Sequence, residues 1–376
     1  PIHFDGVEEV IHMISSLEFE TKLARLRALM EEQGVDTLWL RRVENVSWIT
    51  GGAEVAIDTA SPFGAASVVV TQDRCELWTT TIEAPRLRAE DRLDTRGFTL
   101  RIDPWHAPTE RPAGAVLGVD FPRPDARDLS NALTRLRARL LPAEQDRFRT
   151  LAVNCAEAMQ RAANRLTPGT SETEAAAALC YETRRFNITP TVVLVAADER
   201  VYTVRHPLPT NRIIDRYAML VLCGRQHGLV CSLTRLVHFG PLPGELRRKM
   251  DACAYVDAAM IAASQPGATL ADIFRVAQEA YARVGFDGEW QFHHQGGVAG
   301  YTPREVLATP GETFTLEEGM VCAWNPSISG TKSEDSVLVR PAGQMPEVLT
   351  AMYGWPSRDV SVGGNIVTRP LILEAG

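Results

Sequence analysis

The first part of the chain combines one helical pattern with several short runs of strand type. The segment SLEFETKLARLRALMEEQG carries apolar residues on one helical face and ends at a glycine, which predicts a helix over about 17–33. The runs DTLWL, ASVVVT, CELWTTT and GAVLGVDF are rich in β-branched or aromatic residues and predict strands. Residues 1–142 are therefore expected to form an α/β domain, with the boundary at Pro142 and the charged AEQDR that follows it.

The second part, residues 143–376, repeats one order of predicted elements. Helices are expected over about 144–166 and from Ser171, where Glu174 three residues later completes a capping-box pattern. The strand-type runs TVVLVA, YAMLVLCG and GLVCSLTR follow, then two helices within 243–284, and then the runs ETFTL, MVCAWNP and EDSVLV. Two helices followed by strands thus occur twice, which indicates an internal pseudo-duplication in an α+β domain.

Composition and charge exclude several classes of protein. The chain has 45% hydrophobic and 23% charged residues, a net charge of −8 and no dense block of Lys and Arg, so a nucleic-acid binder is not expected. No apolar run approaches the ~18 residues that cross a membrane, and PIHFDGVEEV lacks the pattern of a signal peptide. The seven scattered cysteines form no C-x-x-C pair, which favours reduced thiols in a cytoplasmic protein.

The stretch QFHHQGGVAGYTPRE, residues 291–305, gathers side chains suited to chemistry. The imidazoles of His293 and His294 can take up and release protons near neutral pH. Arg304 offers a planar fork that suits a substrate carboxylate, and the glycines allow close approach of the backbone to a ligand. A plain ion pair between Arg304 and Glu305, and an ordinary glycine loop, are the structural alternatives.

Four segments of the second part, taken in order, resemble one family. They are RHPLPTN, LVLCGRQHGLVCSLTR, the stretch around His294, and GMVCAWNPSISGTKSEDSVLV. With DTLWLRRVENVSWITGG and ASVVVTQDRCELW in the first part, the chain resembles the creatinase, aminopeptidase P and prolidase family over nearly its whole length. The resemblance implies a creatinase-type N-terminal domain followed by a "pita-bread" domain, in which a curved antiparallel sheet carries two pairs of helices. By analogy with creatinase it also implies a homodimer.

Peptidases of that family bind two metal ions through two Asp, one His and two Glu side chains. Transferred by motif onto this chain, those positions fall on Leu222, Ser232, His294, Asn325 and Glu334. The hairpin is one residue shorter here than in the family, and no Asp or Glu lies within 217–235, so a shift of one residue supplies no carboxylate. With three of the five ligands missing, the resemblance implies no metal pair and no cofactor. A single ion on His294 and Glu334 remains the alternative.

Creatinase is the family's example of chemistry without a metal, and its proton-moving histidine corresponds to His206 in RHPLPTN. The resemblance implies three catalytic residues: His206, His294 and Glu334. Substrate-binding residues are expected to be Arg304, Glu305, His293, Tyr301, Thr234, Ser232, Trp324 and Asn325. For Tyr301 and Trp324, packing in the core is an equal alternative. Thr234 stands where creatinase has a guanidinium-binding Glu, so creatine is not expected as the substrate. Cys223 and Cys231 are expected to pack on the opposite face of their strands.

The sequence thus predicts a metal-independent hydrolase that cleaves a C–N bond in a small molecule bearing a carboxylate. His206 would act as general acid and base, and Arg304 would anchor the carboxylate. The same residues would serve a lyase, an isomerase or an enzyme that cleaves a C–C bond. Two further classes stay open, a non-catalytic binding protein and an Xaa-Pro-type metallopeptidase.

Overall fold

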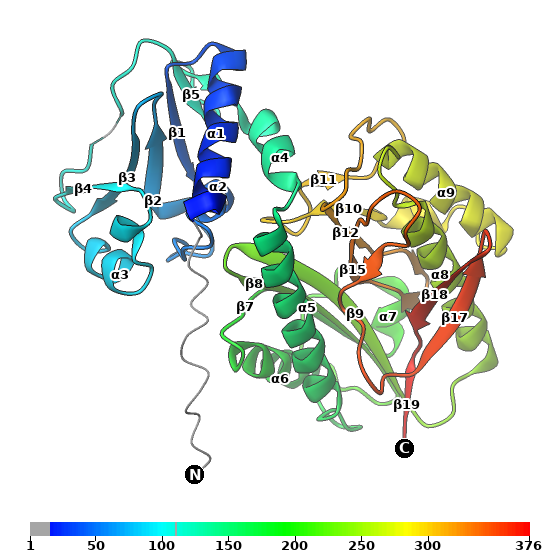
Figure 1. Ribbon diagram of the computed structural model, residues 1–376. Helices are drawn as coiled ribbons and strands as arrows, with labels where there is room; N and C mark the ends of the chain where they lie inside the picture. The colour runs from blue at the N-terminus through cyan, green and yellow to red at the C-terminus, as the bar shows by residue number, and fades with distance from the viewer. Residues whose placement is uncertain (1–15, 110) are drawn as a thin grey trace. The chain divides into compact units, whose positions relative to one another are not determined.

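The computed structural model describes residues 16–109 and 111–376, and Figure 1 shows the course of the chain. The segment PIHFDGVEEV, for which no signal peptide is expected, lies outside the described residues. The described chain divides into two compact units, one ending at Arg137 and the other spanning Ala138–Gly376. None of the helices in the described part is both long and apolar enough to cross a lipid bilayer.

The first unit is built on a mixed sheet in the order β4-β3-β2-β1-β5-β6. Its strands are β1 (Thr37–Arg42), β2 (Phe63–Val70), β3 (Cys75–Thr80), β4 (Thr99–Asp103), β5 (Leu117–Val119) and β6 (Arg127–Asp128). Its helices are α1 (Ser16–Gln33), α2 (Val43–Ile49), α3 (Ala84–Ala89), η1 (Leu93–Thr95) and α4 (Ser130–Ala138). All four predicted strand runs lie in this sheet and the predicted helix is α1, so the α/β prediction is confirmed.

The second unit contains two larger sheets, in the orders β19-β9-β8-β7 and β11-β10-β12-β15-β16. The strands of the first are β7 (Thr189–Ala197), β8 (Tyr217–Gln226), β9 (Leu229–Phe239) and β19 (Leu373–Ala375). Those of the second are β10 (Gly296–Ala299), β11 (Val306–Leu307), β12 (Val321–Trp324), β15 (Asp335–Leu338) and β16 (Glu347–Val348). Two hairpins complete the strands: β13 (Ser327–Ile328) with β14 (Thr331–Lys332), and β17 (Ser357–Val362) with β18 (Asn365–Pro370). A bridge between Thr234 and Glu334 joins the two larger sheets.

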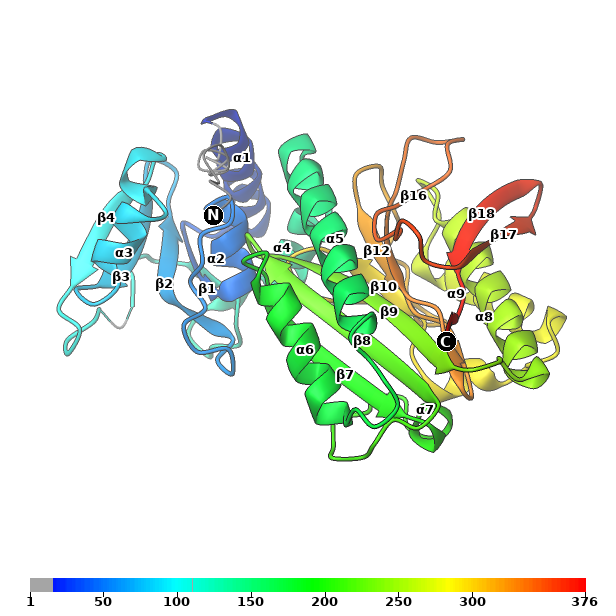
Figure 2. The same ribbon diagram turned by 90° about the horizontal axis from the view of Figure 1, so that it is seen from below.

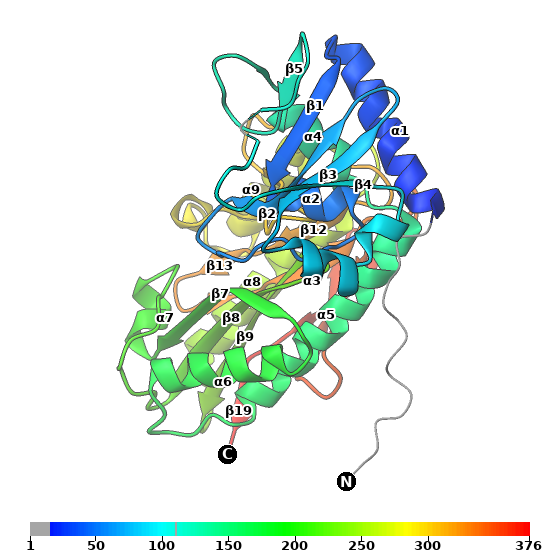
Figure 3. The same ribbon diagram turned by 90° about the vertical axis from the view of Figure 1, so that its left-hand side faces the viewer.

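Two pairs of helices accompany these sheets, as the predicted duplication requires. Helices α5 (Pro142–Ala163) and α6 (Glu172–Arg184) lie side by side against β7, β8 and β9 (Figures 2 and 3). Helix α8 (Gly244–Ala263) packs on α9 (Leu270–Arg283) and contacts β12 and both hairpins. Both helices contribute buried residues to one hydrophobic core. The short helix α7 (Glu199–Thr203) follows β7, and η2 (Glu289–Phe292) precedes β10. The α+β architecture with paired helices is therefore confirmed.

Local signals account for how some of these elements begin. Helix α6 starts where predicted, because the Ser171 hydroxyl accepts a hydrogen bond from the Glu174 N–H and the Glu174 carboxylate accepts one from the Ser171 N–H. The residue types of ETFTL, residues 312–316, predict a strand, and this prediction is wrong: the run makes one isolated bridge, from Thr315 to Thr269. Its carbonyls instead accept bonds from the first N–H groups of α9, which have no partner inside the helix.

Candidate active site

Three imidazoles meet in the second unit. His206 lies in the loop after α7, whereas His293 and His294 follow η2. The Nε2 atoms of His206 and His293 are 3.1 Å apart, a hydrogen-bond distance. The rings of His293 and His294 stack with centroids 4.5 Å apart, and the ring of His206 lies 5.8 Å from that of His294. An ion pair of 2.7 Å between Arg205 and Glu289 ties the two histidine-bearing segments together.

The Glu334 carboxylate lies beside this cluster and is held by two cations. Its Oε1 atom is 2.9 Å from Arg304 Nη2, its Oε2 atom is 2.8 Å from Lys332 Nζ, and Oε2 also accepts the Thr234 hydroxyl at 2.5 Å. Burial alone would raise the pKa of Glu334, but Lys332, Arg304 and these hydrogen bonds lower it well below its ordinary value. Glu334 is therefore ionised, and one negative charge stands between two positive charges.

A cavity of about 280 Å³ opens onto these groups. Its polar side chains are His206, His294, Arg304, Asn325, Lys332 and Glu334. Val192 and Leu194 from β7 and Val221 from β8 line the apolar part. A small pocket that combines an apolar wall with a few convergent charged groups is the usual form of a binding site for a small molecule. Five of the predicted site residues line it, together with Lys332, which the sequence patterns did not single out.

The environment of the histidines keeps their rings neutral at pH 7. Burial, followed by the charge of Lys332, lowers the pKa of His293 to about 2. Burial, followed by the charge of Arg304, lowers the pKa of His294 to about 4. His206 is the most exposed of the three; burial and Lys332 lower its pKa as well. All three imidazoles are therefore proton acceptors at neutral pH, and His206 is the one best placed to exchange protons with a ligand.

The pairing of β8 with β9 shows which side chains face the cavity. Val221 lies opposite Thr234 and Cys223 lies opposite Ser232, so these four residues share one face. The sequence prediction that Cys223 packs on the other face is wrong, since Cys223 lines the cavity with its Sγ 3.3 Å from Ser232 Oγ. Burial raises the pKa of the Cys223 thiol to about 11, which keeps it protonated and a poor nucleophile.

Several residues predicted to bind substrate support the cavity instead of lining it. Ser232 Oγ accepts a bond from Arg304 Nη1 at 3.3 Å, and Thr234 donates to Glu334, so both hold charged groups in place. His293 is buried against His206 rather than open to the cavity. Each of these side chains therefore acts through a neighbour that does line the cavity.

Three further candidates point away from the cavity. Trp324 is fully buried and its indole N–H donates to Ser264 Oγ at the end of α8, so it packs on the other face of β12. Tyr301 donates its hydroxyl to the buried Glu144 carboxylate at 2.6 Å. Glu305 accepts a bond from the Tyr301 N–H at 2.9 Å. None of the three lines this cavity: Tyr301 and Glu305 fix the loop that carries Arg304, and Trp324 fixes β12 against the end of α8.

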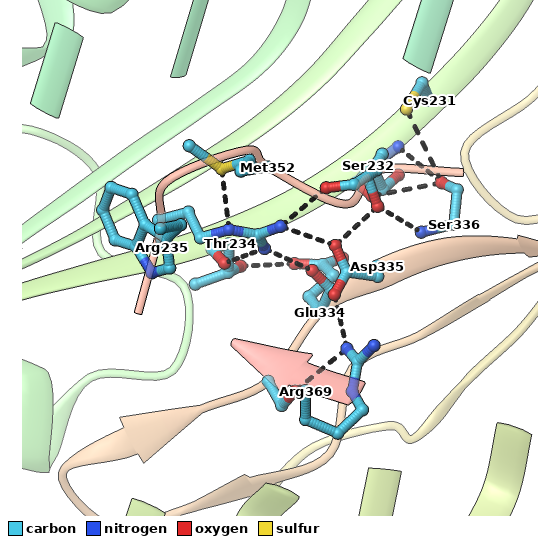
Figure 4. A network of polar contacts seen from close by, with 12 residues as sticks. Cys231, Ser232, Thr234, Arg235, Glu334, Asp335, Ser336, Met352 and Arg369 are labelled. Carbon is cyan, nitrogen blue, oxygen red and sulfur yellow. Dashed lines mark hydrogen bonds and ion pairs between the residues drawn. The ribbon is translucent and has the colours of Figure 1, made fainter. Parts of the chain in front are cut away.

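A buried ionic network stands behind Glu334 and holds its backbone (Figure 4). Asp335, the next residue on the opposite face, bonds Arg235 Nη2 through Oδ1 at 2.8 Å and Arg369 through Oδ2. Arg235 also donates to the backbone carbonyls of Thr234 and Glu334 at 2.8 and 3.2 Å. Arg369 makes a second ion pair, with Asp257 on α8. The position of the Glu334 carboxylate is thus fixed from both sides of the sheet.

The metal pair of the family's peptidases does not fit these residues. Leu222, the first metal-ligand position by motif, is buried on the far face of β8. The neighbouring residues that do face the cavity, Val221 and Cys223, have no carboxylate. Ser232 and Asn325 are neutral, and Glu334 already bonds two cations and a hydroxyl. Two hard divalent ions would therefore meet a single carboxylate that already has partners.

The three imidazoles form a different candidate cation site. The ligand atoms of His206, His293 and His294 all lie within 4.8 Å of one another, and three neutral histidines are a known ligand set for Zn²⁺. Burial is the main cause that lowers the pKa of the His293 and His294 rings, and the charges of Lys332 and Arg304 lower it further. The same repulsion that disfavours a proton here disfavours a divalent cation.

Comparison with known proteins agrees with the fold and adds one relative of stated activity. The model of metallopeptidase family M24 matches residues 146–341, just over half of the chain, and that of the creatinase/prolidase N-terminal domain matches residues 22–176. The agropine synthesis cyclase of Rhizobium rhizogenes is 31% identical over 156 residues. That match covers 39% of this chain and 39% of the relative's own length.

Solved structures share the fold at low sequence identity. The prolidase from Pyrococcus horikoshii OT3 is 17% identical with a TM-score of 0.74, over 88% of this chain and 98% of that one. The Xaa-Pro dipeptidase from Bacillus anthracis is 17% identical with a TM-score of 0.73, over 88% of this chain and 97% of that one. The N-terminal domain of the chickpea FACT subunit SPT16 is 10% identical with a TM-score of 0.66, over 90% and 97%. The same architecture thus spans the chain, and the family matches cover both of its units: the chain belongs to metallopeptidase family M24, within the creatinase, aminopeptidase P and prolidase group.

Proposed function

We propose that this protein is an enzyme that works without a metal ion and acts on a small molecule bearing a carboxylate. The observation that carries the proposal is the charge at the cavity: Arg304 and Lys332 flank Glu334, which leaves one net positive charge among neutral imidazoles. A desolvated positive charge favours an anionic ligand. Arg304, whose position Ser232 and Glu334 fix, anchors the carboxylate.

Hydrolysis of a C–N bond is the reaction that these groups suit best. A water molecule attacks the carbon of the C–N bond, and His206 accepts the proton that the water loses. The carbon–nitrogen bond then breaks, and His206 returns the proton to the departing nitrogen. His293, bonded to His206 through Nε2, fixes the orientation of that ring for both transfers. His294 and Glu334 orient the substrate at the cavity wall.

Ring closure within one substrate molecule is the second candidate, and the agropine synthesis cyclase favours it. In a cyclisation that releases water, a nucleophilic group of the substrate takes the place of the attacking water. The base that removes its proton, and the acid that protonates the leaving group, are the same as in hydrolysis. The geometry of His206 serves both reactions.

A panel of N-substituted amino acids, each carrying a free carboxylate, tests the proposal in the presence of a chelator. Mass spectrometry of the products separates the two reactions: hydrolysis gives two products that together gain one water, and cyclisation gives one product that lacks one water. We expect turnover to persist with the chelator. Turnover that requires an added metal ion would reject the metal-free enzyme.

The pH dependence of kcat/KM is expected to follow His206 as a base. Burial and Lys332 lower its pKa below the ordinary 6.5, and the neutral ring is the form that accepts a proton. The value of kcat/KM should therefore be level near pH 7 and above, and should fall as the pH drops through that lowered pKa. Initial rates over about pH 4 to 9 give the midpoint. A midpoint above about 7 would contradict the assignment.

A further inference from the structure

We infer that Lys332 is a further catalytic residue, whose ammonium is the electrophile at the reacting centre while Arg304 holds the substrate's carboxylate. In other hydrolases a metal ion can hold that role, as a Lewis acid that polarises a carbonyl oxygen. This inference rests on the proposed function, because it assigns a task within the same cavity. It concerns the charge that the substrate develops during reaction, whereas the proposed function concerns the proton transfers.

The first observation is where the two cations lie. Glu334 matches the last metal-ligand position of the family motif, and both of its oxygens are taken: Oε1 by Arg304 at 2.9 Å and Oε2 by Lys332 at 2.8 Å. Two side-chain cations of this protein therefore contact the carboxylate that, in the family motif, contacts a metal ion. Both cations also line the cavity, so a ligand there can reach them.

The second observation is the charge balance of the site. In the family motif four carboxylates face two divalent ions, whereas here one carboxylate faces one ammonium and one guanidinium. Val221, Ser232 and Asn325 stand at or beside three acid positions of the motif and carry no charge, whereas Lys332 places an ammonium at the same cavity. The resulting net charge of +1 favours an anionic centre. The single carboxylate, already paired with two cations, cannot bind a pair of metal ions.

The third observation is that Lys332 is held in place before any ligand binds. Its side chain is 5% exposed, and its backbone pairs with Ser327 in the β13–β14 hairpin. The Glu334 carboxylate fixes the ammonium. A donor that is already oriented in a buried site stabilises a developing charge without the cost of reorganisation at the moment of reaction.

The chemical step assigned to Lys332 is the stabilisation of an oxyanion. When the nucleophile bonds to a carbonyl carbon, the electron pair of the C=O bond moves to oxygen, and that oxygen becomes negative. Lys332 donates a hydrogen bond to it while Arg304 holds the substrate's carboxylate and His206 holds the nucleophile's proton. The electron pair then re-forms the carbonyl, the C–N bond breaks, and the nitrogen leaves with the proton from His206.

Inorganic phosphate, a tetrahedral oxyanion, is the probe that tests Lys332 without knowledge of the substrate. Calorimetric titration at constant ionic strength is expected to show phosphate binding to the wild type, about 10- to 100-fold weaker binding to Lys332→Met, and near wild-type binding to Lys332→Arg. If Lys332→Met does not fold, Lys332→Gln replaces it, because its amide can still donate a hydrogen bond to Glu334 but carries no charge, and the same loss is expected.

Two results would overturn the inference: no phosphate binding to the wild-type protein, or equal affinity in the wild type and Lys332→Met. Once a substrate is known, kcat should fall in Lys332→Met with KM little changed, and Lys332→Arg should restore kcat. If turnover resists chelator and Lys332→Met turns over normally, this inference fails and the proposed function stands. If turnover of the wild type needs a metal ion, the proposed function itself fails.

Discussion

Replacement of His206 by glutamine is expected to lower kcat by a factor of about 10² to 10⁴. Glutamine keeps a hydrogen-bonding group near the position of Nε2 but cannot accept and return a proton near neutral pH. His206 lies at the cavity, and burial and Lys332 lower its pKa, so its ring is a neutral base at pH 7. The variant has no base at this position. Steady-state rates of the two proteins on one substrate from the panel measure the effect.

The matched control is His106→Gln, since His106 is an exposed histidine of the first unit and does not line the cavity. Its turnover should stay within about twofold of the wild type, as for most exposed substitutions. Circular dichroism and the thermal midpoint confirm that both variants are folded. A His206→Gln protein that keeps more than about one tenth of wild-type kcat would remove His206 from the role of acid and base.

Replacement of Asp335 by asparagine is expected to destabilise the second unit by about 3 to 5 kcal/mol. Asp335 pairs with Arg235 and Arg369, whose side chains are 2% and 0% exposed. Asparagine has nearly the same size but is neutral, so the two buried guanidinium groups lose the negative charge that balances them. Its amide NH₂ would also face guanidinium N–H groups, which can only donate. The shift of the urea unfolding midpoint, with the slope unchanged, measures the loss.

The control for this prediction breaks an ion pair at the surface. Asp251 and Arg358 lie 2.7 Å apart, with side chains that are 37% and 52% exposed. Asp251→Asn should cost less than about 1 kcal/mol, because water and ions already screen that pair. Equal losses in the two variants would show that the network behind Glu334 contributes no more than an ordinary surface contact.

Much of the fold could be predicted from local patterns, and the failures have physical reasons. The cap at Ser171 and four strands of the first unit, β1, β2, β3 and β5, follow from residue type and spacing alone, whereas β4 and β6 were not predicted. ETFTL has strand-type residues, but its carbonyls are used by the N-terminus of α9, a contact that no local pattern reveals. The hairpin β17–β18 was not predicted, although Gly363 and Gly364 at its turn, both with positive φ, were a usable signal.

The candidate site was predicted less completely, because it is assembled from side chains far apart in sequence. His206, His294 and Glu334 were found through motifs and do meet around one cavity. The face of Cys223 was mistaken because a shift of one residue along a strand exchanges its two faces. Lys332 was overlooked, although its place two residues before Glu334 in GTKSEDS pointed to it.

The most direct test of a metal-free site is a count of bound metal. The protein is dialysed against Mn²⁺, Co²⁺ and Zn²⁺ in turn, washed, and analysed by elemental mass spectrometry, with turnover measured before and after chelation. We predict far less than one equivalent of each metal and unchanged turnover. One or two equivalents of any of these ions, with turnover lost on chelation and restored by the ion, would contradict the account.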